Sequence, residues 1–173
     1  MANSIDEKKP EVPQYLKDVL DAGGRIDDIL LDREGNWFHN GEKFINERII
    51  SFFSRSVDIT EDGQYVLHYS DNVYPIRVED APYFVTGVRF EGFGTFERIF
   101  ITLSSGESEE LDPSTLFCKA NNALYCRIKK GRLTAKFKRS PSFNILERLD
   151  ESPDGKYYVR LCGTNIELKR MED

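Results

Sequence analysis

The segment ALYCRIKKGRLTAKFKRSPSFNILERL, residues 123–149, decides the fold because it combines two strands, a turn and a helix. Apolar and polar residues alternate in its first and second parts, as they do in strands with one buried face. Between them, Lys129-Lys130-Gly131 has the composition of a hairpin turn. Pro141 suits the first turn of a helix, which we predict over residues 141–149.

The alternation also predicts which side chains are buried, because successive residues of a strand point to opposite faces. We expect a buried cluster that joins one strand face to the apolar residues of the helix: Leu133, Ala135, Phe137, Phe143 and Leu146. Lys136 and Lys138 fall on the opposite face, and we expect them to be exposed.

An earlier stretch, ILLDREGNWFHNGEKFINERIISFF at residues 29–53, repeats this order of hairpin and helix. Trp37 matches Leu133 and His39 matches Ala135 at a spacing of 96 residues. After a three-residue deletion the spacing becomes 93, which aligns the helix predicted over 46–55 with that over 141–149. Two ordinary segments can be alike by chance, but the length of the match favours an internal duplication.

The duplication predicts an α+β protein with mainly antiparallel strands, in two pseudo-repeated β-rich lobes of order β-β-α-β-β. Residues 1–24 are expected to form a polar tail and a short amphipathic helix beginning at Pro13. Residues 25–92 would then form the first lobe and residues 93–173 the second.

Composition excludes several classes of protein. No run approaches the roughly 20 apolar residues of a membrane span. The three cysteines are an odd number without close spacing, and there are only two histidines, so we expect neither disulfides nor a metal site. A reducing, cytoplasmic location follows from that cysteine pattern. The formal net charge of −6 argues against binding to a nucleic-acid duplex or lying on an anionic membrane.

Positive charge is nevertheless concentrated in one segment of the chain. Residues 121–139 contain seven basic and no acidic side chains, so this segment has a charge of +7 and the rest of the chain −13. Such a segment is either a solvated strand face that blocks edge pairing or a site for a compact anion. A phosphate-bearing small molecule fits this distribution better than a bilayer does.

Catalytic motifs such as GxSxG, HExxH and the P-loop are absent from the sequence. The adjacent acids Glu79 and Asp80 would point to opposite faces of a strand, which is poor geometry for a two-carboxylate hydrolase. A turn before Pro82 is the alternative role for this pair. We therefore expect no enzymatic activity and no cofactor.

Four short motifs, in order, resemble the bacterial family catalogued as domain of unknown function 1285. They are WFHNG at 37–41, IISFF at 49–53, VEDAP at 78–82 and LxAxxxR at 133–139. The resemblance covers residues from about 29 to about 149. It implies a duplicated fold whose second half is similar to pleckstrin-homology domains, a role in signal transduction, and a nucleotide-like or other phosphate-bearing ligand between the lobes. The ligand-site residues that it implies are Trp37, His39, Glu79, Asp80 and Arg139.

One position departs from the family pattern. Where relatives have Pro-Ile-x-Arg after the Gly41 position, this chain has Asn46 in place of the arginine. The departure implies a weaker or a different ligand.

The sequence leaves two functional hypotheses. In the first, the protein is a signalling module in which Trp37 offers a flat wall, His39 a hydrogen bond and Arg139 a charge to the anion. Trp37 is otherwise a simple core residue and His39 a satisfied core histidine, and Arg139 otherwise pairs with Glu79 or Asp80 to clamp the lobes together. In the second hypothesis, the protein is a non-enzymatic adaptor that binds another protein through exposed aromatic residues or strand edges.

Overall fold

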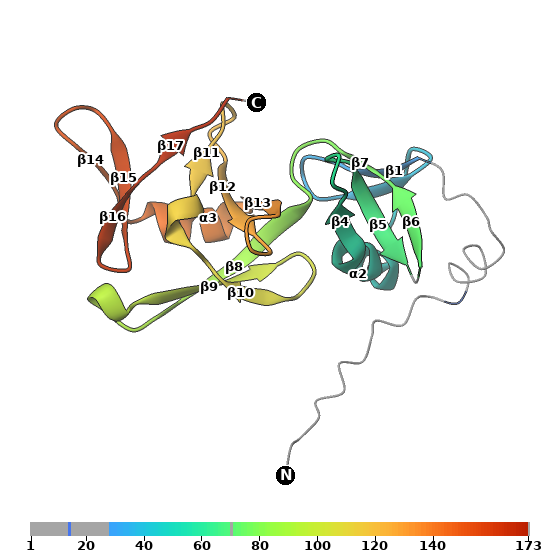
Figure 1. Ribbon diagram of the computed structural model, residues 1–173, viewed down its shortest axis with the longest axis horizontal. Helices are drawn as coiled ribbons and strands as arrows, with labels where there is room; N and C mark the ends of the chain where they lie inside the picture. Colours follow the sequence, from blue (N-terminus) through green and yellow to red (C-terminus); the bar gives the residue numbers. More distant parts are fainter. Residues whose placement is uncertain (1–13, 15–27, 70, 173) are drawn as a thin grey trace, which may run out of the picture.

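The computed structural model describes residues 14, 28–69 and 71–172 and shows a mixed α+β protein (Figure 1). The regular elements of this part of the chain are mostly strands, which form four sheets and are accompanied by two α-helices. The α+β class expected from the sequence is therefore confirmed. Apart from Gln14, the tail and short helix expected in residues 1–24 lie outside the described residues.

The first half of the described chain, residues 29–78, forms two small sheets around one helix. Strands β3-β2-β1-β7 make one sheet and β4-β5-β6 the other. The elements are β1 (Ile29–Leu31), β2 (Trp37–His39), β3 (Glu42–Lys43), α2 (Glu47–Ser56), β4 (Val57–Ile59), β5 (Tyr65–Tyr69), β6 (Asn72–Pro75) and β7 (Arg77–Val78).

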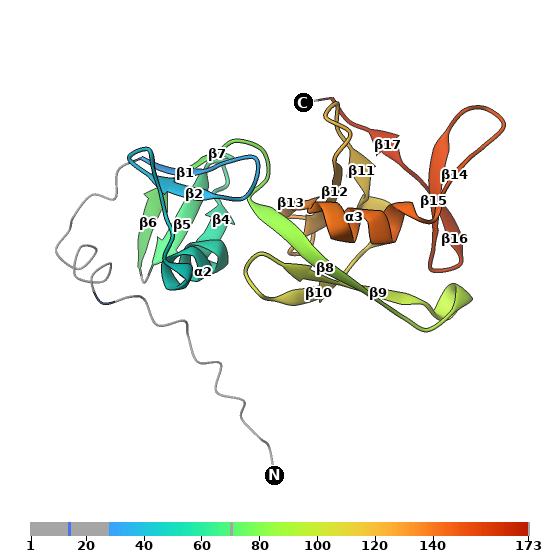
Figure 2. The same cartoon turned by 180° about the vertical axis from the view of Figure 1, so that it is seen from behind.

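The second half, residues 83–170, contains a seven-stranded sheet of order β10-β9-β8-β13-β12-β11-β17 and the three-stranded sheet β14-β15-β16 (Figures 1 and 2). Its strands are β8 (Tyr83–Glu91), β9 (Arg98–Leu103), β10 (Ser108–Glu110), β11 (Phe117–Cys118), β12 (Leu124–Ile128), β13 (Leu133–Phe137), β14 (Leu149–Glu151), β15 (Tyr157–Leu161), β16 (Thr164–Glu167) and β17 (Lys169–Arg170). Its helices are η1 (Gly94–Phe96), η2 (Pro113–Thr115) and α3 (Arg139–Leu146). The division expected after residue 92 falls inside the β8–β9 hairpin.

The same order of hairpin, helix and three-stranded antiparallel sheet occurs in both halves. The strand registers fix the alignment of the two halves. Val57 pairs with Leu67 in the first half, and Leu149 pairs with Val159 in the second, so equivalent residues are 92 positions apart. The turns at 60–64 and 152–156 agree with that spacing, because the hydroxyls of Thr60 and Ser152 make equivalent hydrogen bonds. The spacing of 93 expected from the sequence is one residue too long in this region.

That one-residue error explains why the burial expected for Phe143 is wrong. Phe143 is 54% exposed, whereas Pro141 and Ile145 are the buried residues of α3. At a spacing of 92 they correspond to the buried Ile49 and Phe53 of α2. A shift of one residue turns a helix position by about 100°, which takes Phe143 out of the core and leaves Leu146 half-buried. The helix also begins at Arg139, two residues before the position expected.

The alternation predicted for β13 is confirmed on its apolar face, where Leu133, Ala135 and Phe137 are all buried. The exposure expected for Lys136 and Lys138 is wrong, since both are half-buried. Lys136 Nζ donates to the Arg33 carbonyl at 2.9 Å, and Lys138 Nζ donates to the Glu34 carbonyl. The polar face of β13 therefore lies against the β1–β2 turn instead of facing solvent.

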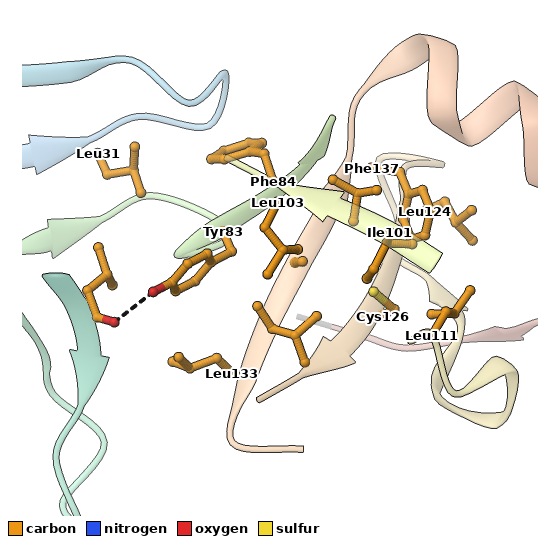
Figure 3. Packing of buried hydrophobic residues seen from close by; sticks show 14 of the residues in the cluster. Leu31, Tyr83, Phe84, Ile101, Leu103, Leu111, Leu124, Cys126, Leu133 and Phe137 are labelled. Carbon is orange, nitrogen blue, oxygen red and sulfur yellow. Dashed lines mark hydrogen bonds between the residues drawn. The ribbon is translucent and has the colours of Figure 1, made fainter. Parts of the chain in front are cut away.

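A single hydrophobic cluster runs through both halves, from Ile29 to Leu161. Tyr83 lies at the junction, and its buried hydroxyl donates a 3.0 Å hydrogen bond to the Val57 carbonyl in β4 (Figure 3). Burial raises the pKa of Tyr83, so the phenol keeps the proton that it donates. This core fixes the position of the first half against the second.

We predict that Ile145→Ala lowers the free energy of unfolding by about 2–5 kcal/mol, since it leaves a cavity in this core. Phe143→Ala should lower it by less than about 0.5 kcal/mol, as for most surface substitutions. Urea unfolding followed by circular dichroism measures both. A larger loss of unfolding free energy in Phe143→Ala than in Ile145→Ala would show that the buried face of α3 is assigned wrongly.

Candidate functional site

Trp37 and His39 occupy different environments, although they are neighbours on β2. Trp37 is only 2% exposed. Its Nε1 donates to Ser54 Oγ at 3.3 Å, and its ring centroid lies 5.4 Å from that of Phe53. This side chain is part of the hydrophobic core. His39 is half-buried and stacked on Phe44, with ring centroids 5.9 Å apart.

The other three predicted residues lie elsewhere. Glu79 and Asp80 are in the connection between β7 and β8, and both line one cavity. Arg139 is exposed in the first turn of α3, with its guanidinium 5.7 Å from the centroid of the Phe143 ring. The structure thus brings Glu79 and Asp80 together and leaves Trp37, His39 and Arg139 apart from them. The binding role of the five residues stays a prediction.

Asp80 is at the centre of a half-buried polar cluster between the two halves. Its carboxylate accepts a hydrogen bond from the Tyr125 hydroxyl at 2.7 Å and lies 3.0 Å from Lys136 Nζ and 3.2 Å from Lys119 Nζ. Burial alone would raise the pKa of Asp80, but the hydrogen bonds from Tyr125, Lys136 and Lys119 outweigh it and hold that pKa below its ordinary value. Asp80 is therefore a charged carboxylate with its acceptor sites occupied.

The cavity beside Asp80 has a volume of about 710 Å³. Its lining has equal numbers of acidic and basic side chains: Arg33, Glu34, Glu79, Asp80, Lys119 and Lys136, together with Asn121 and Ala123. Because the protein's own carboxylate already holds the two lysines, an external anion would have to displace it. The ion pair between Asp80 and Lys136 thus joins the two halves, as an ion pair between Arg139 and Asp80 was expected to do.

A second cavity, of about 420 Å³, shares none of these residues and is also lined from both halves. We call it the Arg132 cavity. Its charged or titratable lining residues are Arg55, Asp58, His68, Glu107, Lys129 and Arg132, beside Ser56, Val57, Tyr83 and Leu133. With His68 neutral, the lining has a net charge of +1.

The cations of the Arg132 cavity are positioned by surface contacts. Arg132 lies 2.9 Å from Asp58, which His68 also approaches at 3.8 Å. Lys129 pairs with Glu107, and Arg55 Nε donates to the Ser105 carbonyl at 3.0 Å. The ion pairs of Arg132 and Lys129 are partly exposed, so each is weak, whereas the Arg55 hydrogen bond ends on the buried Ser105. Arg132 and Lys129 can therefore turn toward an anion at little cost.

Sequence reasoning found part of this cavity and missed the rest. Lys129 and Arg132 belong to the basic segment that was singled out as an anion site. Arg55 and His68 come from α2 and β5 of the first half, and no local pattern connects them with that segment. Their approach depends on packing between residues more than 60 apart in the chain.

Nucleophilic and metal chemistry find little support in the described residues. Burial raises the pKa of the Cys126 thiol to about 12, so it is not a reactive thiolate at neutral pH. Within residues 14, 28–69 and 71–172, no group of three or more His, Cys, Asp or Glu side chains could hold a metal ion. None of the helices in that part of the chain has the length and apolarity needed to span a bilayer.

We predict that Asp80→Asn lowers the free energy of unfolding by about 1.5–3 kcal/mol near neutral pH, because charge-assisted hydrogen bonds are lost. The folded-state pKa of Asp80 is lowered, so its contribution is complete above the ordinary value of 3.8 and is lost as the pH falls through the folded-state value. The difference between wild type and variant should thus shrink below pH 3.8. Urea titrations across this pH range measure it.

Glu79→Gln is the matched control, since Glu79 is more exposed and its ion pair with the Arg33 side chain spans 3.6 Å. A glutamine can still accept the 3.1 Å hydrogen bond that the Arg33 backbone N–H donates to Glu79. It should change the free energy of unfolding by less than about 1 kcal/mol. Equal effects of the two substitutions would contradict the role given to Asp80.

Comparison with known proteins supports the fold. No family model matches the sequence, and no curated protein does. Two crystal structures of DUF1285 family proteins are similar to this chain. The one from Silicibacter pomeroyi DSS-3 is 22% identical with a TM-score of 0.67, over 82% of this chain and 79% of that one. The one from Shewanella baltica OS155 is 20% identical with a TM-score of 0.53, over 67% of this chain and 87% of that one. The resemblance found in the sequence motifs is therefore confirmed, and the chain has the fold of DUF1285 family proteins.

Proposed function

We propose that the protein is a non-enzymatic, cytoplasmic signalling module that binds a phosphate-bearing small molecule in the Arg132 cavity. Its two halves act as lobes, the second of them similar to pleckstrin-homology domains, and the ligand binds where the lobes meet. The observation that supports the proposal best is the net positive lining of this cavity, in a chain whose overall charge is −6. A compact anion is attracted to such a place and repelled from most of the remaining surface.

The residue types of the cavity suit a phosphate group. Arginine presents donors in a planar fork that matches phosphate oxygens, and lysine adds a mobile point charge. Arg55 and Arg132 come from different halves, so one phosphate could accept from both. The volume of about 420 Å³ is in the range of small-molecule sites. The imidazole of His68 would be available to the uncharged part of the ligand.

The Asp80 cavity is larger but less suited to an anion. Its lysines already contact a half-buried carboxylate that is part of the chain and is therefore always present. In the Arg132 cavity the competing acids, Asp58 and Glu107, are more exposed and pair with single cations at its rim. An incoming dianion competes better against such solvated pairs.

We predict that a thermal-shift panel of nucleotides and phosphorylated sugars identifies a stabilising ligand, and that its effect weakens as salt rises. Arg132→Ala should then lower the affinity by about tenfold or more, because a desolvated arginine–phosphate contact contributes roughly 1.5–3 kcal/mol. Isothermal titration calorimetry measures the affinity. No stabilisation by any phosphorylated compound at low salt would contradict the proposal.

Arg139→Ala separates this site from the one implied by the family resemblance. Arg139 lies in the same basic segment, is exposed, and lines neither cavity. Its replacement should leave the affinity within about twofold of wild type. A tenfold loss in Arg139→Ala with none in Arg132→Ala would place the ligand at the start of α3 instead.

An adaptor role is the second candidate function. It is favoured by two phenylalanines, Phe93 and Phe96, which are 90% and 87% exposed. Exposed aromatic residues that lie together are typical of protein-binding surfaces. The two functions are compatible, because these residues lie outside the Arg132 cavity.

A further inference from the structure

The β8–β9 hairpin ends in residues 92–96, which we call the aromatic tip. Phe93 and Phe96 are almost fully exposed on either side of Gly94, and none of the five residues is charged. The charged residues that flank the tip are paired with other side chains. Glu91 pairs with Arg89 at 2.5 Å, and Arg98 pairs with Glu110 at 2.7 Å. The tip therefore presents an apolar surface to solvent.

This apolar surface is held in a defined shape. Gly92 has a φ of +77°, and a Cβ there would lie 2.6 Å from the Phe96 carbonyl oxygen. The β15–β16 turn packs against the tip so closely that a Cβ on Gly163 would lie 2.8 Å from the Thr95 nitrogen. Figures 1 and 2 both show η1 beside β16. These contacts require glycine at both positions.

Glu97 fixes the end of the tip. Its side chain is only 8% exposed and lies 2.7 Å from Arg148, while its other oxygen accepts from the Cys162 backbone at 2.8 Å. A partly buried ion pair thus anchors a loop whose two phenylalanines remain exposed. Such a preorganised surface loses little conformational entropy when it binds a partner.

A cavity of about 500 Å³ adjoins the tip through Gly94 and Glu97. Its lining includes Leu149, Tyr158 and more acidic than basic side chains, which gives a net charge of −1. Glu97 is paired with Arg148. Glu147 and Asp150 have no cationic partner among the described residues. Arg160, the second cation of the lining, donates to the Asn165 side chain at 3.3 Å. The cavity thus places two carboxylates that have no ion pair, and one such arginine, beside the exposed phenylalanines.

We propose that the aromatic tip and this cavity form a docking surface for a basic, apolar segment of a partner protein. The apolar side chains of that segment would pack on Phe93 and Phe96, and its lysine or arginine side chains would face Glu147 and Asp150. Charge complementarity decides between occupants, because the acidic lining repels an anionic bilayer as well as a phosphate-bearing ligand. The aromatic pair supplies the packing energy of a small hot spot.

Two fluorescein-labelled helical peptides test the proposal by fluorescence anisotropy with the full chain. One consists of leucine and lysine, and the other has glutamate in place of every lysine. The leucine–lysine peptide should bind and the leucine–glutamate peptide should not. Phe93→Ser with Phe96→Ser should weaken binding by at least about tenfold. Glu147→Gln with Asp150→Asn should weaken it by about threefold or more and reduce its salt dependence.

Ile45→Ser is the matched control, since Ile45 is 88% exposed and belongs to the first half. It should leave peptide affinity unchanged. Equal binding of both peptides, or binding that survives loss of both phenylalanines, would overturn the proposal. The proposal would also be overturned if the leucine–lysine peptide did not bind and the protein instead bound phosphatidylcholine–phosphatidylserine vesicles through Phe93 and Phe96. Thermal unfolding of each variant, compared with wild type, ensures that a loss of binding is not a loss of fold.

Discussion

The half-buried Asp80 carboxylate is the contact on which the arrangement of the two halves depends. It lies in the connection that leaves the first half, yet its partners belong to the second: Tyr125 and Lys136 lie in the large sheet, and Lys119 directly follows β11 of that sheet. A charge in this position is tolerable only while these partners surround it. Together with the Tyr83–Val57 hydrogen bond and the shared core, it restrains sliding of one half over the other. The shape of the Arg132 cavity follows from that restraint.

The cations of the basic segment, residues 121–139, have two roles, which depend on where they lie in the β12–β13 hairpin and just after it. On β13 the odd-numbered residues from Leu133 to Phe137 enter the core, and the even-numbered residues face the first half. Lys136 and Lys138 bind backbone and carboxylate groups there. Lys129 and Arg132, at the turn before the strand, reach the cavity instead. One hairpin thus holds the halves together through Lys136 and Lys138 and brings Lys129 and Arg132 to the cavity, where the proposed function places the anion.

Local patterns in the sequence predicted the local structure well. Strand alternation gave the buried face of β13, and the helix predicted over 46–55 is found at 47–56, where the Asn46 side chain caps it by accepting from the backbone N–H groups of Arg48 and Ile49. What local patterns could not give was long-range register. Because the alignment of the repeats was wrong by one residue, Phe143 was expected in the core, where the structure has Ile145. No local pattern decided between a core position and a binding wall for Trp37, because the hydrogen bond from its indole to Ser54 joins residues that are 17 positions apart. Likewise, that Arg55 and Arg132 line one cavity depends on the packing of the two halves, which periodicity does not encode.

The central claim is that an anion binds in the Arg132 cavity, which Arg55 and Arg132 line from the two halves. The most direct measurement is a titration of the isotopically labelled protein with the best phosphorylated ligand, followed in amide nuclear magnetic resonance spectra. The account predicts that the largest shift changes fall in residues 55–58, at His68 and in residues 129–133, from both halves at once. Changes confined to the surroundings of Asp80 and Lys119, or to the first turn of α3, would contradict it.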